Sequence, residues 1–377
     1  MKKKIHLWMP EIFAFKGGIQ TYSAFLLTAI QTLYPQAKYD VFLKHDRSFP
    51  LDHPYLPQTQ FHPSGNIPLK LRTVAFASQL IIQGLFQKPD LIITTHANFS
   101  PASYRLKQLT GIPYWVIAHG VEVWNLKNAS VKKACSNAAK ILAVSNYTRD
   151  RLLLEQNLSY EQIVVLPNTF DEKRFKINNK PKHLLEKYSL KPEQPIILIV
   201  SRLSADDGYK GYDKILEALP QIKTQIPNIH YIIVGKGDDR PRIEQLITQL
   251  GLQNNVTLSG FVPEEEICDY YNLCDVFAMP SKGEGFGIVY LEALACGKPC
   301  LGGNKDGAID ALCNGELGAL VAPDNVEEIA QTLIEILQGT YPNSLMYQPE
   351  KLREKVIEKF GFERFKQTLN IYLQKQL

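Results

Sequence analysis

Two glutamates at a fixed spacing are the first residues in this sequence that could carry out chemistry. Glu284 and Glu292 stand eight positions apart within the segment Ser281–Glu292. A carboxylate beside a reacting group can act as a base, a nucleophile or an electrostatic stabiliser, and we expect Glu284 in such a position. Glu292 is expected to accept hydrogen bonds from the hydroxyl groups of a ligand. The alternatives are a loop carboxylate in water for Glu284, and a helix cap or ion pair for Glu292.

The residues around these glutamates predict a phosphate site. An apolar run at Asp275–Pro280 predicts a strand before the segment, and Ile288–Cys296 predicts a helix after it. Gly285 and Gly287 let the backbone approach a ligand closely. The free N–H groups and dipole of a helix N-terminus favour an anion. Phosphate-binding backbone next to carboxylates predicts a ligand with both phosphate and hydroxyl groups, such as a nucleotide sugar.

Two cations follow another predicted strand. Arg202 comes directly after the apolar run that ends at Val200–Ser201, and Lys210 lies eight positions later. Arginine offers a planar fork and lysine a point charge, and together they suit a diphosphate. They could stabilise the charge that builds on a diphosphate as it leaves. The alternative is a solvated pair on the surface.

The first half of the chain contributes a histidine and a glycine pair. His119 ends a buried run before Gly120, and His96 ends a similar run. A lone histidine is more often a structural residue, but the end of a strand is a typical position for a ligand-binding residue. Gly17–Gly18 lies in a glycine loop before a predicted helix at Thr21–Leu33.

The sequence predicts neither a nicotinamide cofactor nor a metal ion. The turn Gly235–Arg240 begins like a dinucleotide-binding fingerprint but has arginine at the third glycine, which makes the match weak. Two aspartates never stand at positions i and i+2, so the chain has no Asp-x-Asp clamp for a metal-bound diphosphate. The adjacent pairs Asp206–Asp207 and Asp238–Asp239 are interpreted as solvated turns. We therefore expect a metal-independent reaction with no cofactor.

Apolar strands alternate with helices along the whole chain, which indicates parallel sheets covered on both faces. We predict an α/β fold with two doubly wound, Rossmann-like domains that face a central cleft. The expected boundaries are an acceptor-side domain at 1–170, a linker at 171–195, a nucleotide-sugar domain at 196–357 and a final helix at 358–377. Residues 44–68, rich in proline, are expected to be mostly loop.

Composition narrows the class of protein. The chain has 377 residues and a net charge of +4, which does not indicate nucleic-acid binding. Its six cysteines show no CxxC spacing and are interpreted as reduced thiols. No apolar run approaches the roughly 20 residues that span a bilayer, and Pro10 cuts short the N-terminal apolar run, so a cytoplasmic protein is expected. The apolar helix at 69–86 and the basic N-terminus leave two readings open, a core helix or a peripheral membrane contact.

The spacing of these motifs resembles glycosyltransferase family 4, the retaining, nucleotide-sugar-dependent enzymes of the GT-B fold. The resemblance covers nearly the whole chain and is densest at Ile197–Val321. Its hallmark is Glu284, seven residues and Glu292, followed by Ala293–Pro299. Ser201–Leu203 with Lys210–Gly211, the Val234–Gly237 turn and the Ser259–Val262 turn match in the same order.

The resemblance implies a role for each matching residue. Arg202 and Lys210 would hold the donor diphosphate, and Glu292 the ribose. Glu284 and the backbone of Gly285, Phe286, Gly287 and Ile288 would contact the sugar and phosphates. Phe261–Val262 would lie against the base, Gly17–Gly18 would approach the diphosphate, and His119 would face the transferred sugar. The final helix at 358–377 would cross back onto the first domain. Two features depart from the family pattern: the long Arg202-to-Lys210 spacing, and Asn304–Gly307 in place of the usual acidic residue after Gly302–Gly303.

The predicted function is transfer of a hexosyl group from a UDP- or GDP-sugar to an acceptor hydroxyl with retention, in surface polysaccharide or glycolipid synthesis. The acceptor is expected to be a saccharide or a lipid-linked glycan. A sugar phosphorylase or nucleotide-sugar epimerase of the same fold is the alternative, and a non-catalytic nucleotide-sugar-binding protein is a further one.

Overall fold

A computed structural model describes residues 2–14, 17–156 and 158–377 of the chain. The chain divides into two compact units. Unit 1 comprises Met1–Thr169 together with Phe362–Leu377, and unit 2 comprises Phe170–Gly361. The segment 171–195, expected from the sequence to be a linker, groups with unit 2, where Lys180 pairs with Asp275 (Nζ to Oδ2, 2.7 Å).

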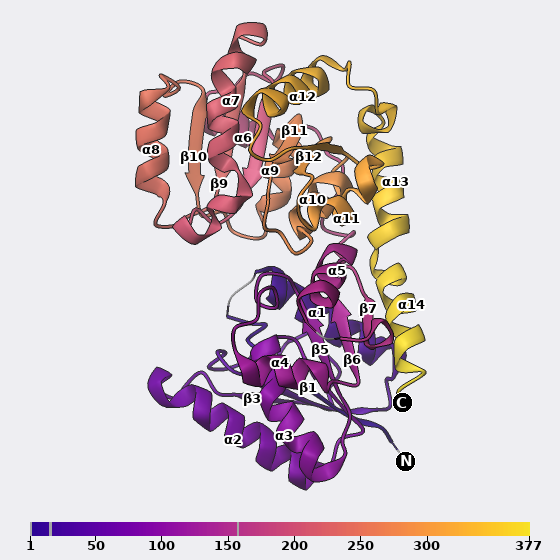
Figure 1. The fold of residues 1–377 in the computed structure, drawn as a ribbon. Coiled ribbons are helices and arrows are strands. Elements are labelled where there is room, and N and C mark those ends of the chain that lie inside the picture. The colour runs from indigo at the N-terminus through magenta and orange to yellow at the C-terminus, as the bar shows by residue number, and fades with distance from the viewer. Residues whose placement is uncertain (1, 15–16, 157) are drawn as a thin grey trace. The chain divides into compact units, whose positions relative to one another are not determined.

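The described residues of unit 1 form one parallel sheet (Figure 1). The strands run in the spatial order β3-β2-β1-β4-β5-β6-β7, so the order reverses between β1 and β4. Their bounds are β1 Lys4–Met9, β2 Lys38–Leu43, β3 Thr59–Pro63, β4 Leu91–Thr94, β5 Tyr114–Ala118, β6 Lys140–Ala143 and β7 Ile163–Val165.

Helices cover this sheet, and the C-terminal helix is one of them. The α-helices of unit 1 are α1 Gly18–Leu33, α2 Leu69–Gln87, α3 Ser100–Thr110, α4 Ala129–Ser136, α5 Asn146–Glu155 and α14 Phe362–Leu373, with short 3-10 turns η1 Ala97–Phe99 and η2 Tyr160–Gln162. Helix α14 packs against α1, where the Tyr22 and Phe365 rings lie 5.6 Å apart, and Tyr372 donates a hydrogen bond to the Val165 carbonyl (3.0 Å).

Unit 2 repeats the same plan with a second parallel sheet. Its described strands follow the order β10-β9-β8-β11-β12-β13, and the order reverses between β8 and β11. Their bounds are β8 Ile196–Val200, β9 His230–Val234, β10 Val256–Gly260, β11 Val276–Met279, β12 Cys300–Gly303 and β13 Ala319–Val321.

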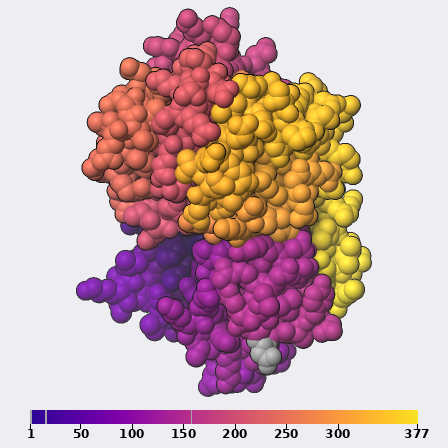
Figure 2. All heavy atoms as spheres, turned by 45° about the horizontal axis from the view of Figure 1, so that its top comes forward, coloured from indigo at the N-terminus to yellow at the C-terminus, as the bar shows by residue number. Residues whose placement is uncertain are grey.

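The helices of unit 2 include a neighbouring pair, α7 and α12, and α12 lies in the amber region at the surface in Figure 2. The α-helices are α6 Lys182–Lys187, α7 Tyr212–Gln225, α8 Arg240–Gln249, α9 Ile267–Leu273, α10 Ile288–Ala295, α11 Ala308–Ala311, α12 Val326–Gln338 and α13 Pro349–Phe360, with 3-10 turns η3 Ala205–Lys210, η4 Cys313–Gly315 and η5 Ser344–Tyr347.

The central strands of both sheets are buried on both faces. Ile197, Leu198 and Ile199 in β8, and Leu7 and Trp8 in β1, have no exposed surface. Such continuous apolar runs are typical of parallel sheets flanked by helices. The predicted fold class, two doubly wound α/β sheets, is confirmed.

Several predicted elements differ from the structure. Residues 44–68 are not all loop, because Thr59–Pro63 pairs in parallel with β2 as an edge strand. An edge position tolerates Pro63, since a missing N–H costs little there. Helix α1 starts at Gly18, before the predicted Thr21. Helices α3 and α4 were not predicted.

Candidate functional site

The candidate site in unit 2 lies where the strand order of its sheet reverses. In a doubly wound sheet, ligands bind beyond the carboxyl ends of the strands at this reversal. Strand β8 ends at Val200, just before Arg202, and β11 ends at Met279, just before the segment that holds Glu284. The two strands are paired neighbours. The topology therefore places two loops side by side. We call the loop after β8, which carries Arg202 and Lys210, the cation loop, and the loop after β11, which carries Glu284, the glutamate loop.

An ion pair joins these two loops. The Lys210 Nζ contacts Glu284 Oε1, and the two side chains are only 15% and 14% exposed. Burial alone would lower the pKa of Lys210, but the carboxylate of Glu284 opposes it, and the pKa of the lysine is raised. Lys210 therefore keeps its positive charge throughout the neutral pH range. A fixed, charged lysine beside a carboxylate is suited to binding phosphate.

Turn η3 explains the long spacing between the two cations. The additional residues Ala205–Lys210 form this 3-10 turn, and Asp207 within it reaches back to Arg202, with 2.9 Å between the Arg202 Nε and Asp207 Oδ2. Asp207 is buried, while the Arg202 side chain is 69% exposed. The prediction that Asp207 belongs to a solvated turn is wrong, because its carboxylate orients the arginine.

A buried aspartate that the sequence reading did not assign holds the glutamate loop in place. Asp306 accepts hydrogen bonds from the backbone N–H of Glu284 (2.8 Å) and of Ala308 (2.9 Å). Gly307 donates in turn to the Glu284 carbonyl (2.8 Å). Burial raises the pKa of Asp306 to about 6. The segment Asn304–Gly307, noted in the sequence as a departure from the family pattern, thus fixes the backbone that carries Glu284.

Helix α10 begins in this same loop and carries no side-chain cap. Its N-cap is Gly287, at φ 88° and ψ 76°, a backbone conformation that favours glycine. A Cβ atom there would lie 2.6 Å from the Tyr290 ring. No acidic residue occupies the first turn that starts at Ile288. The first N–H groups of α10 are therefore available to an anion such as phosphate.

Glu292 lies one turn further along α10. Its Oε2 accepts a hydrogen bond from the Tyr271 hydroxyl on α9 (2.7 Å). Burial raises the pKa of Glu292 to about 7, although the Tyr271 hydrogen bond and the nearby Arg174 partly oppose this shift. Near neutral pH the residue thus exchanges between a carboxylate, which only accepts hydrogen bonds, and a carboxylic acid, which also donates one.

This pKa predicts a pH dependence of donor binding. If Glu292 accepts hydroxyl hydrogen bonds as a carboxylate, affinity for a nucleotide sugar should fall about tenfold from pH 8 to pH 6, because a group with a pKa of about 7 is roughly nine-tenths ionised at pH 8 and roughly one-tenth ionised at pH 6. Calorimetric titration at several pH values measures this directly. In Glu292→Gln the affinity should be weaker and flat with pH. A wild-type affinity that stays constant from pH 6 to pH 8 would contradict the assignment.

The turn after β10 presents an aromatic ring. Phe261 is 66% exposed, and the Lys236 Nζ lies 4.9 Å from the centre of its ring. Val262, the residue predicted to lie against the base, is half-buried beside it. Strand β10 is the outer strand of the sheet, next to β9. This turn therefore lies at the carboxyl edge of the sheet, two strands away from β8.

Glycines 235 and 237 are required for close backbone packing and give no sign of a dinucleotide. Gly235 has φ 141°, and a Cβ atom there would lie 1.7 Å from the Ser201 carbonyl oxygen. At Gly237 the corresponding distance to the Leu203 carbonyl oxygen is 1.9 Å. The Leu203 N–H donates to the Lys236 carbonyl (3.1 Å). The turn thus supports the loop that carries Arg202.

Gly235→Ala should therefore lower the free energy of unfolding by about 3 kcal/mol, because both the backbone conformation and the clash with a carbonyl oppose a side chain. Urea unfolding of the full chain measures the change. Gly208→Ala is the matched control, since nothing lies within 4 Å of its Cβ position and its φ is not positive. Equal stability of the two variants would contradict this role for Gly235.

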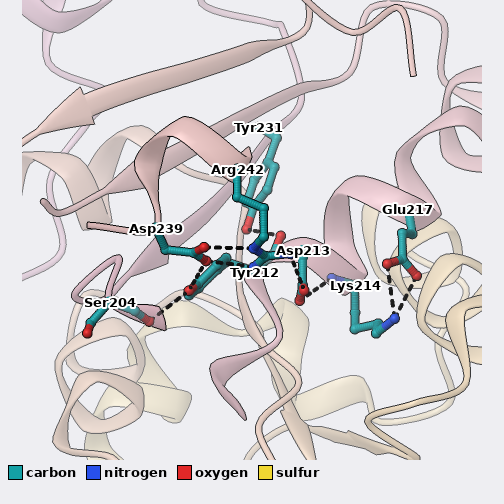
Figure 3. A network of polar contacts seen from close by, with 8 residues as sticks. All are labelled: Ser204, Tyr212, Asp213, Lys214, Glu217, Tyr231, Asp239 and Arg242. Carbon is teal, nitrogen blue, oxygen red and sulfur yellow. Dashed lines mark hydrogen bonds and ion pairs between the residues drawn. The ribbon is translucent and has the colours of Figure 1, made fainter. Parts of the chain in front are cut away.

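A network of polar groups around the buried Tyr212 and Asp239 supports the cation loop (Figure 3). The Tyr212 hydroxyl contacts the Ser204 carbonyl (3.2 Å) and Asp239 Oδ2 (2.6 Å). Arg242 binds both oxygens of Asp239 at 2.7 and 2.6 Å, and this pairing lowers the pKa of Asp239. Asp239 is 5% exposed. The prediction of a solvated turn at Asp238–Asp239 is therefore wrong for Asp239.

In unit 1, His119 follows β5 and is held by three contacts. Its Nε2 donates to the Thr95 carbonyl (3.0 Å), its backbone N–H donates to Glu122 Oε1 (2.5 Å), and its ring meets the Tyr22 ring edge-on at 5.1 Å. Burial lowers the pKa of His119 to about 3. The residue is neutral at pH 7, and its Nδ1 carries a lone pair that can accept a hydrogen bond.

The glycine pair lies at the start of helix α1. Gly17 is the N-cap in extended backbone, Gly18 is the first helical residue, and no side chain caps this end. Tyr22, which packs on His119, belongs to the same helix, so the structure brings α1 close to His119. His96 is different: its Nδ1 accepts the Asn98 N–H (3.1 Å) and caps η1, which is a structural role.

The structure thus gathers the predicted residues into two groups. Arg202, Lys210, Glu284, the start of α10 and Glu292 lie along two neighbouring loops and one helix of unit 2. Gly17–Gly18 and His119 belong to unit 1.

Two family models match the chain. The model described as "Glycosyltransferase Family 4" matches residues 17–174, and the model described as "Glycosyl transferases group 1" matches residues 182–359. The chain belongs to glycosyltransferase family 4. The boundary between the two matches falls close to the boundary between the units at Thr169 and Phe170.

Curated relatives of this family 4 chain differ in the sugars and acceptors that their names record. A GDP-mannose-dependent alpha-(1-6)-phosphatidylinositol monomannoside mannosyltransferase from Mycolicibacterium smegmatis is 30% identical over 231 residues, which cover 58% of this chain and 59% of that protein. An alpha-D-kanosaminyltransferase from Streptomyces kanamyceticus is 28% identical over 208 residues, covering 55% and 53% of the two chains. The chain thus matches less than two thirds of the length of these relatives.

Solved structures match over nearly the whole family 4 chain. HepE from Anabaena, crystallised with UDP, superposes with a TM-score of 0.80 at 20% identity, covering 99% of this chain and 100% of that one. Sucrose-phosphate synthase from Thermosynechococcus elongatus superposes with a TM-score of 0.82 at 22% identity, covering 99% of both chains. At this identity the likeness shows the fold, and it confirms the predicted GT-B class.

Proposed function

We propose that this chain transfers a hexosyl group from a UDP- or GDP-sugar to an acceptor hydroxyl, with retention at the anomeric carbon and without a metal ion. The observation that carries the proposal is the buried Lys210–Glu284 ion pair, which lies at the reversal of strand order in the unit 2 sheet. A cation for the leaving diphosphate and a carboxylate for the sugar are thereby fixed next to each other. The names of the relatives, a mannosyltransferase and a kanosaminyltransferase, support the same reaction class.

In this reaction the cations of unit 2 receive the developing charge. As the bond between the sugar and the diphosphate breaks, negative charge builds on the phosphate oxygens, and Lys210 and Arg202 stabilise it. The uncapped start of α10 adds N–H donors. These fixed positive groups take the part that a divalent ion plays in a metal-dependent enzyme, which supports a reaction without metal or cofactor.

The carboxylates and His119 complete the proposed site. Glu284 acts beside the transferred sugar, and Glu292 accepts hydrogen bonds from the ribose. Val262 and Phe261 meet the base, and the backbone of Gly285, Phe286, Gly287 and Ile288 contacts phosphates and sugar. From unit 1, Gly17–Gly18 approach the diphosphate, and neutral His119 offers Nδ1 to a sugar hydroxyl. With a pKa of about 3, His119 serves as a hydrogen-bond acceptor and not as a cation.

The proposed acceptor is a saccharide or lipid-linked glycan in surface polysaccharide or glycolipid synthesis. Support comes from the mycobacterial relative, whose name records a phosphatidylinositol mannoside.

We further propose a cytoplasmic location with peripheral contact at the inner face of the membrane. The six cysteines are unpaired in the described structure, which is usual in a reducing compartment. No helix in the described part of the chain is long and apolar enough to cross a membrane.

A donor screen tests the proposal. UDP-, GDP- and ADP-sugars are compared by thermal shift, with and without EDTA. The true donor should stabilise the chain by about 2.7 kcal/mol at a hundredfold excess over its Kd, and EDTA should not change this. The stabilising donor is then incubated with candidate acceptors, and the anomeric configuration of the product is read by NMR. A product formed from donor alone would favour an epimerase, and an inverted product or loss of activity in EDTA would contradict retention or metal independence.

A further inference from the structure

Helix α2 packs on unit 1 through one face only. Its fully buried positions are Phe76, Leu80 and Gly84, which follow one another at helical spacing. The Phe76 ring lies 5.3 Å from the Phe99 ring. A Cβ atom at Gly84 would lie 2.1 Å from a methyl group of Leu106 on α3, so the two helices are in close contact. In Figure 1, α2 lies along the outside of unit 1 next to α3.

The opposite face of α2 is apolar and exposed. Leu71, Val74, Ile82 and Leu85 are spaced to share one side of the helix, and Phe86 extends it. Between 38% and 83% of each of these side chains is exposed. The core-helix reading of this segment is therefore wrong for this face. Ser78, also exposed, lies among them on this face. Exposed apolar side chains that gather on one side of a helix mark a surface that binds a partner.

The charges on α2 indicate which partner. The helix contains no acidic residue, and its charged positions are Lys70 and Arg72, followed by Lys88. Among the described residues, none of these three forms an ion pair with a carboxylate: Arg72, for example, donates to the carbonyls of Gly65 (2.7 Å) and Ile67 (3.0 Å). An apolar stripe on a helix with basic and no acidic residues matches a bilayer that carries anionic lipid.

A second copy of the chain fits this face less well. A two-fold interface pairs the same patch on both subunits. Pairing α2 with itself would bring Lys70, Arg72 and Lys88 towards like charges, with no acidic residue on the helix to compensate. The charges of α2 therefore favour a negatively charged surface over self-association.

We propose that the outer face of α2 binds the surface of an anionic bilayer, with the helix lying in the plane of the interface. The apolar stripe inserts among the acyl chains, and Lys70 and Lys88 contact lipid phosphates. This interaction goes beyond the transfer reaction and does not depend on it.

The position of α2 links the bilayer to the acceptor side of unit 1. The Arg72 Nη1 lies 3.4 Å from Nδ1 of His45, which follows the carboxyl end of β2 by two residues. The first turn of α2 therefore lies at the carboxyl edge of the sheet, the edge that also carries His119 after β5. A lipid-linked acceptor in the bilayer would approach unit 1 at this edge. This consequence rests on the proposed function, whereas membrane binding does not.

Vesicle co-sedimentation of the full chain tests the proposal. Phosphatidylcholine vesicles are compared with vesicles of phosphatidylcholine and phosphatidylglycerol in equal parts, without donor. The wild type should bind the anionic vesicles at least tenfold more tightly than the neutral ones, and added salt should weaken this binding. The variant Val74→Asp/Ile82→Asp/Phe86→Asp should lose at least tenfold in affinity. Lys70→Gln/Lys88→Gln should lose both affinity and salt dependence.

The matched control is Leu154→Asp/Ile371→Asp. These residues are also exposed apolar side chains of unit 1, at 87% and 55%, but they lie on α5 and α14. The control should bind anionic vesicles like the wild type. Thermal shift with donor should be unchanged in all variants, which separates this test from that of the proposed function and shows that the variants fold.

Three results would overturn the proposal. The first is a wild type that does not bind anionic vesicles, and the second is a triple α2 variant that binds them as tightly as the control. The third is a wild type that is dimeric by light scattering and becomes monomeric in the α2 variant without a change in vesicle binding, which would make the face a subunit interface.

Discussion

Lys210→Ala is expected to lower kcat/KM for glycosyl transfer by about a hundredfold to a thousandfold, the loss typical when one preorganised stabilising group is removed. Lys210 is buried and contacts Glu284, and the glutamate keeps the pKa of the lysine raised. Its charge is therefore present before the donor binds. Most of the loss should appear in kcat, because the charge on the leaving diphosphate is greatest in the transition state. Steady-state kinetics with the donor found by thermal shift measure both constants.

Lys214→Ala is the matched control for this variant. Lys214 pairs with Glu217 three residues later on α7, on the partly exposed side of the network in Figure 3. An exposed pair of this kind contributes little, so activity should stay within about twofold of the wild type. Lys210→Ala also leaves Glu284 without its partner, so urea unfolding must show that the variant is folded under assay conditions. A folded Lys210→Ala variant with more than half of wild-type activity would contradict the proposed function.

The sequence could predict that Arg202 and Glu284 lie at the same edge of the sheet, because the strands that precede them determine this. Both residues follow buried apolar runs, Ile196–Val200 and Val276–Met279, and parallel strands place their carboxyl ends at one edge. What the local sequence pattern could not show was that β8 and β11 are neighbouring strands. The resemblance to family 4 independently implied that Arg202, Lys210 and Glu284 contact the same donor.

The supporting residues could not be predicted because their partners are distant in the sequence. Asp306 binds the Glu284 N–H across 22 positions, and Asp239 binds Tyr212 across 27. Asp207 and Asp239 each belong to an adjacent aspartate pair, a pattern typical of exposed turns. Each pairs with an arginine nearby in the sequence, Asp207 with Arg202 and Asp239 with Arg242, but the sequence does not show that the fold buries both carboxylates. The sequence did contain one signal for the role of Asp306, which is the glycine that follows it. In the structure, a Cβ atom at Gly307 would lie 2.1 Å from the Gly285 carbonyl oxygen.

The two faces of α2 show a similar limit. An apolar helix such as Leu69–Gln87 is compatible with a core or with a surface, and its sequence pattern does not say which residues meet α3. Gly84 lies on the packed face, where the absence of a side chain lets Leu106 approach the backbone of α2. Strand β3 escaped prediction for a related reason: it is a five-residue edge strand within a segment rich in proline.

Glu284→Gln is the second substitution with a large expected effect, a loss of about a hundredfold or more in kcat. Glutamine keeps the size of the side chain and can still accept a hydrogen bond from Lys210, but it carries no charge. The backbone contacts with Asp306 and Gly307 remain, so the loop should keep its conformation. A loss in kcat with little change in donor affinity would therefore report the carboxylate charge beside the sugar. Glu217→Gln, in the exposed pair with Lys214, is the control and should stay near wild-type activity.

The double variant Lys210→Ala/Glu284→Gln decides whether the ion pair acts as one unit. When two residues act together, the losses caused by their single substitutions do not multiply. The kcat of the double variant should therefore be at most about tenfold below that of the less active single variant. If instead the two losses multiply, Lys210 serves the diphosphate and Glu284 the sugar independently, and their contact only positions them. Full activity of folded Glu284→Gln would exclude the carboxylate charge from the reaction, and the site would then reduce to a phosphate-binding loop.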